Sequence, residues 1–182
     1  METKLNDPEL SSEPALSTWV DNHLTRLGQS AIRLQDRIVV YFDHPEVLRK
    51  LSKVGTHVIV PESMREKKQD AGLATVGLLP GETKTIGELT VTAIPAYNKT
   101  KPMHQRKNGF VGYFVRLPNG IVLYHSDYTD FVPEMVDLKP DVALLPFSSL
   151  GAKKFLAFGG QRVKEHPLAA PKTTPPHATD NY

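Results

Sequence analysis

Apolar and polar residues alternate along much of the chain with the two-residue period of half-buried β-strands. In residues 88–94 the apolar side chains of Leu89, Val91 and Ala93 alternate with polar ones, and this is the clearest strand pattern in the sequence. Shorter apolar runs predict further strands at residues 24–27, 31–34, 37–42, 57–60, 110–117, 121–125 and 141–147. The chain is therefore expected to be rich in short strands.

Turn and helix signals lie between these strands. Residues 118–120 read Pro-Asn-Gly between two apolar runs and predict a hairpin, since an Asn-Gly pair adopts tight hairpin turns. Apolar residues repeat at helical spacing between Pro45 and Gly55, which predicts a helix, and the charged residues 62–71 predict a second one. Hairpins joined by a few helices favour a layered α/β (α+β) domain over a doubly wound parallel sheet.

The ends of the chain differ in composition from its middle. Residues 1–17 combine two prolines with scattered serines and glutamates, and residues 159–182 contain four prolines and few bulky aliphatic side chains. Segments of this composition bury too little apolar surface to order themselves. We expect a flexible N-terminal tail over residues 1–17, one folded domain over residues 18–158 and a Pro-rich disordered tail over residues 159–182.

Composition narrows the possible chemistry. The 182 residues include 22 basic and 20 acidic side chains and no cysteine. Without cysteine there are no disulfides, thiolate metal sites or cysteine nucleophiles, so any metal ion has to be held by His, Asp or Glu. The net charge of +2 does not indicate a nucleic-acid partner, and no apolar run reaches the ~20 residues that a membrane span needs. We expect a soluble, cytoplasmic protein.

Side chains that can bind a metal ion lie where predicted strands end. Asp43 and His44 follow one strand, His104 lies in a cationic loop after another, and Asp127 follows a third. Each has a simpler interpretation. Asp43 can cap the helix that follows, His104 can belong to a solvated basic loop, and Asp127 can belong to an ordinary turn.

Several short segments occur in an order that resembles the metallo-β-lactamase fold family. The resemblance covers about residues 24–149 and is to small metal-dependent hydrolases related to the ascorbate-phosphate lactonases and the N-acylphosphatidylethanolamine phospholipases. It implies an αββα sandwich, here an incomplete one. The segments that carry it are LGQSA at 27–31, IVVYFD at 38–43, PGE at 80–82, TVTAIPAYN at 90–98, VGY at 111–113, YHSDYTD at 124–130 and PDVALLP at 140–146.

The departures from the family fall on its metal site. The motif His-x-His-x-Asp-His is missing, so Asp43 is either the family's earlier strand-end Asp or, with His44, the last pair of the motif after a deletion. Tyr128 stands where the bridging Asp is expected, and Asp127 is displaced by one position. The final metal-binding His is absent, because the family pattern stops after Ser149 as it would after a change of frame or splicing.

The resemblance implies a hydrolase in which a metal-bound hydroxide attacks an ester, lactone or phosphodiester. The implied metal ligands are His104, Asp127, Asp43 and His44. With so few ligands, we expect at most one weakly held zinc, manganese or iron ion, or none.

The other expected roles depend on whether the protein is active. Asp127 is also the implied catalytic residue, and Lys101 and Arg106 would bind a small anionic substrate. The alternative is a non-catalytic, truncated family member that acts as a binding or regulatory module. Loss of a strand and a helix would expose an edge, so we expect an oligomer or pairing with an intact homologue.

Overall fold

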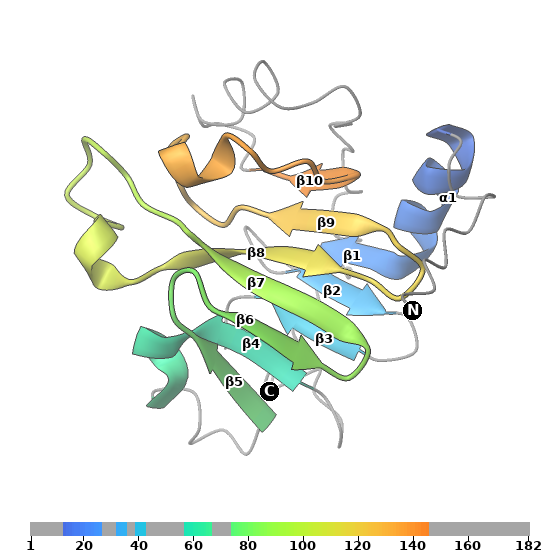
Figure 1. Cartoon of the computed structure of the whole chain (residues 1–182), viewed down its shortest axis with the longest axis horizontal. Coiled ribbons are helices and arrows are strands. Elements are labelled where there is room, and N and C mark those ends of the chain that lie inside the picture. Colours follow the sequence, from blue (N-terminus) through green and yellow to red (C-terminus); the bar gives the residue numbers. More distant parts are fainter. Residues whose placement is uncertain (1–12, 27–31, 36–38, 43–56, 67–73, 146–182) are drawn as a thin grey trace, which may run out of the picture.

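The computed structural model describes residues 13–26, 32–35, 39–42, 57–66 and 74–145. Within these residues the strands form two five-stranded sheets (Figure 1). The first sheet has the order β1-β2-β3-β4-β5, in which β1, β2 and β3 are antiparallel neighbours and β3, β4 and β5 are parallel ones. Its strands are β1 (Leu24–Arg26), β2 (Ile32–Gln35), β3 (Val39–Phe42), β4 (His57–Pro61) and β5 (Ala74–Leu78).

The second sheet has the order β10-β9-β8-β7-β6. Strands β6 to β9 are antiparallel neighbours, and β10 runs parallel to β9. Its strands are β6 (Thr83–Ile86), β7 (Leu89–Pro95), β8 (Val111–Arg116), β9 (Val122–His125) and β10 (Val142–Leu144). The described helices are α1 (Glu13–His23) and the 3-10 turns η2 (Glu62–Met64), η3 (Arg106–Asn108) and η4 (Pro133–Met135).

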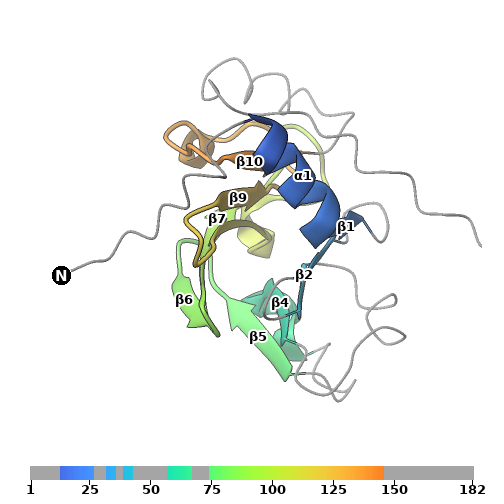
Figure 2. The ribbon, with the colours of Figure 1, turned by 90° about the vertical axis from the view of Figure 1, so that its right-hand side faces the viewer.

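The two sheets face each other across one hydrophobic core. Leu34, Val40 and Ile59 of the first sheet and Val91 and Val115 of the second are fully buried in it. Helix α1 lies beside β1 and adds Trp19 and Val20 to the same core (Figure 2). Burial of a large aliphatic side chain stabilises a fold by about 1.5–3 kcal/mol, so this shared core fixes the sheets against each other.

Alternate residues of the same strands face outward into two smaller apolar clusters. Tyr41, Val58 and Val60 form one on the outer face of the first sheet. The other, on the second sheet, packs β-strand residues against η4 and consists of Ile94, Tyr97, Tyr124, Val132, Met135 and Ala143. Each sheet thus carries an apolar cluster on part of its outer face as well as the shared core on its inner face.

The predicted layered α/β class is confirmed. Leu89, Val91 and Ala93 face the core, and a hairpin turn joins β8 to β9 as the Asn-Gly signal predicts. Helix α1 was not expected, because residues 13–17 were assigned to the tail by their composition. The predicted helix between Pro45 and Gly55 lies outside the described residues, and of the one over 62–71 only the beginning, with η2, is described.

Candidate functional site

Two loops leave the second sheet at the same end. Because β7, β8 and β9 are antiparallel neighbours, the last residues of β7 and β9 lie at the same end of the sheet. There Pro95 pairs with Val111, and His125 pairs with Tyr113. The β7–β8 loop comprises residues 96–110 and contains η3, and the β9–β10 loop comprises residues 126–141 and contains η4. His104 and Asp127 are therefore brought to the same end of the molecule.

Hydrogen bonds donated by backbone amides hold the two loops together. The amide of Tyr97 donates to the hydroxyl of Thr129 over 2.9 Å, and the amide of Asp130 donates to the carbonyl of Tyr97 over 3.1 Å. The amide of Lys99 donates to the carboxylate of Asp130 over 2.8 Å. Tyr97 and Thr129 are buried, so these bonds are shielded from water and fix the register between the loops.

His104 occupies a constrained position in the β7–β8 loop. Its φ of 56° lies in the left-handed region, which is uncommon for residues other than glycine. The imidazole stacks on Phe110 with ring centroids 4.3 Å apart and meets the ring of Tyr128 edge-on at 5.7 Å. Its Nδ1 is buried and has no hydrogen-bond partner among the described residues. A buried imidazole nitrogen without a partner is suited to a metal ion or a ligand donor.

Asp127 is the second residue of this end with left-handed backbone geometry. Its φ is 53°, and its side chain is partly exposed directly after β9. The preceding residue, Ser126, is buried, and its hydroxyl donates to the carbonyl of Asp127 over 3.0 Å. Such strained positions cost about 1–3 kcal/mol and occur preferentially at functional sites.

The candidate metal ligands among the described residues are few. Among the described residues, no three His, Asp or Glu side chains form a group that could hold a metal ion. A catalytic zinc site takes three protein ligands, and His104 and Asp127 supply two at most. Among the described residues, His104 and Asp127 are therefore too few to complete either a single-ion site or a two-ion centre. Asp43 and His44, the other predicted ligands, lie outside the described residues.

The two predicted substrate-binding cations have different surroundings. Lys101 is exposed, and its Nζ lies 3.2 Å from the hydroxyl of Tyr128 and 5.1 Å from the centroid of that ring. Arg106 donates from Nη2 to a carboxylate oxygen of Glu134 over 2.9 Å and lies 5.4 Å from the centroid of the Tyr97 ring. Lys101 and His104 thus both contact the ring of Tyr128, whereas Arg106 is paired with the carboxylate of Glu134.

Tyr97 links Arg106 and Glu134 to the buried side of the loops. Its hydroxyl donates to the other carboxylate oxygen of Glu134 over 3.3 Å. Burial raises the pKa of Tyr97, and the negative charge of Glu134 raises it further, against the opposing effect of Arg106. Tyr97 therefore stays neutral and acts as a donor. The pairing of Arg106 with Glu134 was not predicted, because these residues lie 28 positions apart and no local sequence signal connects them.

A surface cavity of about 430 Å³ opens beside this pair and not at His104 or Asp127. Its floor belongs to β7, and Phe110 lies in its wall and also stacks on His104. The cavity therefore adjoins the candidate site through one shared ring. Its lining consists of Pro80, Gly81, Ala93, Ile94, Pro95, Tyr97, Arg106, Phe110 and Glu134.

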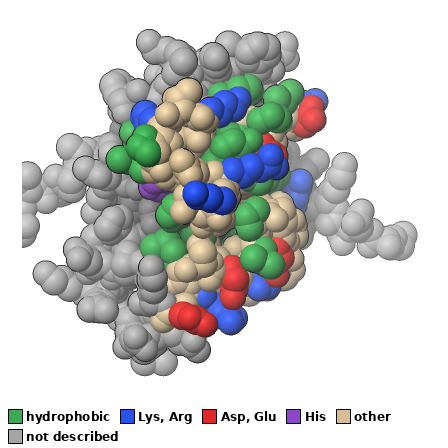
Figure 3. Space-filling model, turned by 90° about the vertical axis from the view of Figure 1, so that its left-hand side faces the viewer, with side chains coloured by type: hydrophobic (Ala, Val, Ile, Leu, Met, Phe, Trp, Pro, Cys, Tyr) green, Lys and Arg blue, Asp and Glu red, His purple; other side chains and the backbone are tan. Residues whose placement is uncertain are grey.

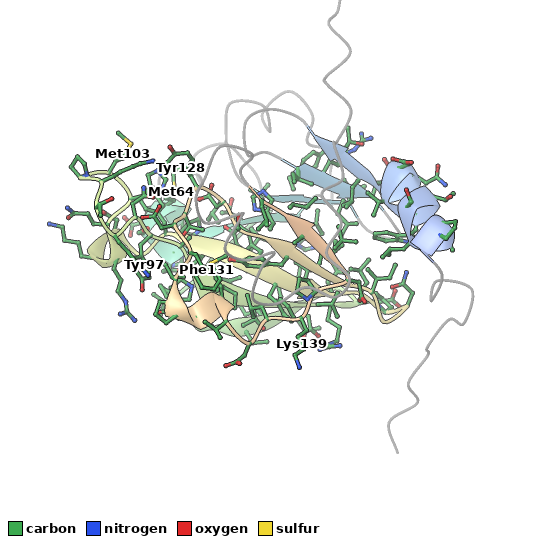
Figure 4. The ribbon with its side chains drawn as sticks, turned by 90° about the horizontal axis from the view of Figure 1, so that it is seen from above. Met64, Tyr97, Met103, Tyr128, Phe131 and Lys139 are labelled. Atoms are coloured by element: carbon green, nitrogen blue, oxygen red, sulfur yellow. The ribbon has the colours of Figure 1, made fainter. Side chains whose placement is uncertain are left out.

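Other side chains of the 124–130 segment are placed for structural reasons. Tyr124 is fully buried, and burial raises the pKa of its phenol far above its ordinary value. His125 is also buried and lies against the ring of Tyr113 at 6.3 Å between centroids. Figure 4 shows Tyr128 with Met103 at one end of the molecule, and Lys139 on a different side.

Sequence comparison links the chain to a metal-dependent hydrolase. The chain is 30% identical over 156 residues to the UPF0173 metal-dependent hydrolase of Ruegeria sp. (strain TM1040). The match covers 79% of this chain and 64% of that protein, so the matched part is less than two-thirds of its relative's length. No protein-family model matches the chain.

Comparison of solved structures identifies similar folds. A protein from Parabacteroides distasonis assigned as a metal-dependent hydrolase has a TM-score of 0.61 at 21% identity, over 75% of this chain and 77% of that one. Igni18, a metallo hydrolase from Ignicoccus hospitalis, has a TM-score of 0.50 at 17% identity, over 67% of this chain and 69% of that one. At these identities the likeness concerns the fold.

Proposed function

We propose that this protein is hydrolase-like, with a reduced metal site. The premise is that the chain has the metallo-β-lactamase fold and is homologous to a metal-dependent hydrolase. It would hold at most one divalent ion of zinc, manganese or iron. The proposed ligands are His104 and Asp127 in the described part, together with Asp43 and His44. The position of His104 carries this proposal, because its buried Nδ1 lacks a partner among the described residues.

The proposed reaction is hydrolysis of an ester, lactone or phosphodiester. A bound divalent ion lowers the pKa of a coordinated water to about 7 and polarises the bond to be cleaved. Asp127 is the proposed catalytic carboxylate, since it could hold the proton that a water loses. Lys101 is exposed beside Tyr128 and is the first candidate to attract a small anionic substrate, and Arg106 is the second.

A reduced ligand set lowers the expected activity. Each missing imidazole or carboxylate removes a lone pair or a negative charge that favours ion binding. Only two candidate donors lie among the described residues, which supports weak binding and impaired hydrolysis. The protein would work in the cytoplasm, and no described helix is long and apolar enough to cross a membrane.

The second candidate function is that of a non-catalytic binding or regulatory module. It is favoured by the same small donor set among the described residues. Such a module could form an oligomer or pair with an intact homologue. The two functions differ in whether a divalent ion binds at His104.

Calorimetric titration with zinc or manganese separates them. The hydrolase-like function predicts a binding heat for the unmodified chain that His104→Ala removes and that the matched control His57→Ala retains. Absence of binding heat in the unmodified chain would establish the non-catalytic alternative. Binding that survives His104→Ala would show that the ligand assignment is wrong.

A further inference from the structure

The tip of the β7–β8 loop exposes a large apolar side chain among cations. Residues 99–107 contain four basic and no acidic side chains, and we call these residues together with Tyr128 the cationic tip. Met103 is 60% exposed at its centre, and Tyr128 is 37% exposed beside it. The described residues include four exposed large hydrophobic side chains, and two of the four, Met103 and Tyr128, belong to the cationic tip.

The backbone under Met103 is held firmly. The buried side chain of Asn98 donates to the carbonyl of Met103 over 3.1 Å, and the amide of Asn98 donates to the carbonyl of His104 over 2.7 Å. The amide of Lys99 is bonded to Asp130. The backbone of the loop is therefore held at Met103, whose side chain stays 60% exposed to solvent.

The cations around Met103 are largely uncompensated. Arg106 pairs with Glu134, whereas Lys99, Lys101 and Lys107 form no salt bridge with any carboxylate of the described residues. Figure 3 shows this side of the molecule, where Lys and Arg side chains gather with hydrophobic ones among them. The cationic tip thus combines three lysines that form no salt bridge among the described residues with one projecting apolar group. The carboxylates of Asp130, which accepts from the Lys99 amide, and of Asp127, next to Tyr128 in the chain, adjoin the tip and lower its net charge.

We propose that the cationic tip docks on an anionic phospholipid surface, with Met103 in the acyl boundary and the lysines at the headgroup phosphates. A projecting side chain enters a fluid lipid layer without a preformed pocket, whereas a protein partner would have to supply one. Single-stranded nucleic acid is bound by stacking on exposed aromatic rings, and the Tyr128 ring is already in contact with Lys101. Docking of this kind needs no metal ion and is independent of the proposed hydrolysis.

Vesicle co-sedimentation tests the proposal with the full chain. Vesicles of one part phosphatidylserine to two parts phosphatidylcholine are expected to bind the protein at low salt, and vesicles of phosphatidylcholine alone are not. Met103→Ser should lower the partition coefficient about five-fold, as expected for losing one partly buried apolar side chain. The double variant Lys99→Gln, Lys107→Gln should lower it by about ten-fold or more.

Matched controls come from another side of the molecule. Lys139 is exposed and lies away from Met103 (Figure 4), and Val136, three positions before it in the chain, is 46% exposed. Val136→Ser and Lys139→Gln should therefore leave the partition coefficient unchanged. Equal losses in tip and control variants, or no vesicle binding, would overturn the proposal. It would also be overturned by a short single-stranded DNA or an acidic peptide that binds more tightly and is unaffected by Met103→Ser.

Discussion

The hydroxyl of Thr129 lies between the backbone amide and the backbone carbonyl of Tyr97, 2.9 Å from the nitrogen and 3.1 Å from the oxygen. Both residues are buried. One side chain of the β9–β10 loop is therefore hydrogen-bonded to both backbone groups of Tyr97, just beyond the end of β7. This contact sets the position of the loop that carries Asp127 relative to the loop that carries His104.

Thr129→Val should destabilise the protein by about 1–3 kcal/mol, because it keeps the shape of the side chain and leaves the buried Tyr97 amide without its acceptor. Urea denaturation measures the free energy of unfolding, and amide hydrogen exchange at Tyr97 should become faster. Thr85→Val, at an exposed position of β6, is the control and should change stability by less than about 0.5 kcal/mol. Equal effects of the two substitutions would contradict the role given to Thr129.

Gly112→Ala should be more destabilising than Gly81→Ala. A Cβ at Gly112 would lie 2.7 Å from the backbone oxygen of His125 and 3.0 Å from the Cα of Ser126, so the backbone before Asp127 would have to move. We expect a cost of about 3 kcal/mol. Gly81 has open space but a φ of 85°, which costs a side chain about 1 kcal/mol. Thermal and urea unfolding measure the two losses of stability. A smaller loss for Gly112→Ala than for Gly81→Ala would show that β8 and β9 are not packed so closely.

Glu82 should titrate below its ordinary value. The amide of Leu79 donates to its carboxylate over 2.8 Å, and Lys84 lies 3.0 Å away, so these two contacts hold the pKa of Glu82 below 4.5. A lowered pKa in the folded state means that this contribution to stability is complete above pH 4.5 and is lost as the pH falls through the lower value.

An NMR titration that follows the Leu79 amide shift checks this expectation. The shift should have its midpoint below pH 4.5, and Glu82→Gln should remove it. A midpoint at or above the ordinary value, or a shift that persists in Glu82→Gln, would show that this carboxylate is not the cause.

The sequence predicts the second sheet better than the elements around it. Leu89, Val91 and Ala93 bury one face of β7 as their period requires, because an amphipathic strand needs only its own alternation to be recognised. Helix α1 was missed because its polar composition conceals two core residues, Trp19 and Val20. Strands β5 and β6 were missed because their short segments contain threonine, lysine and glycine and owe their burial to neighbouring strands.

The candidate site was predictable only in part. The predicted strand ends correctly place the loops of His104 and Asp127 at the same end of the second sheet, because antiparallel neighbours bring alternate strand ends together. That the two side chains share a metal ion stays a prediction. The pairing of Arg106 with Glu134 depends on how two long loops pack and has no signature in local sequence. The roles of Asp43 and His44 stay a prediction, since they lie outside the described residues.

The metal content of the purified protein tests the central claim, a reduced single-ion site, most directly. After equilibrium dialysis against zinc, manganese or iron, elemental analysis should find at most one ion per chain, and Asp127→Asn should lower that content while Asp137→Asn, an exposed control, should not. Two tightly held ions per chain, retained through dialysis against metal-free buffer, would contradict the account.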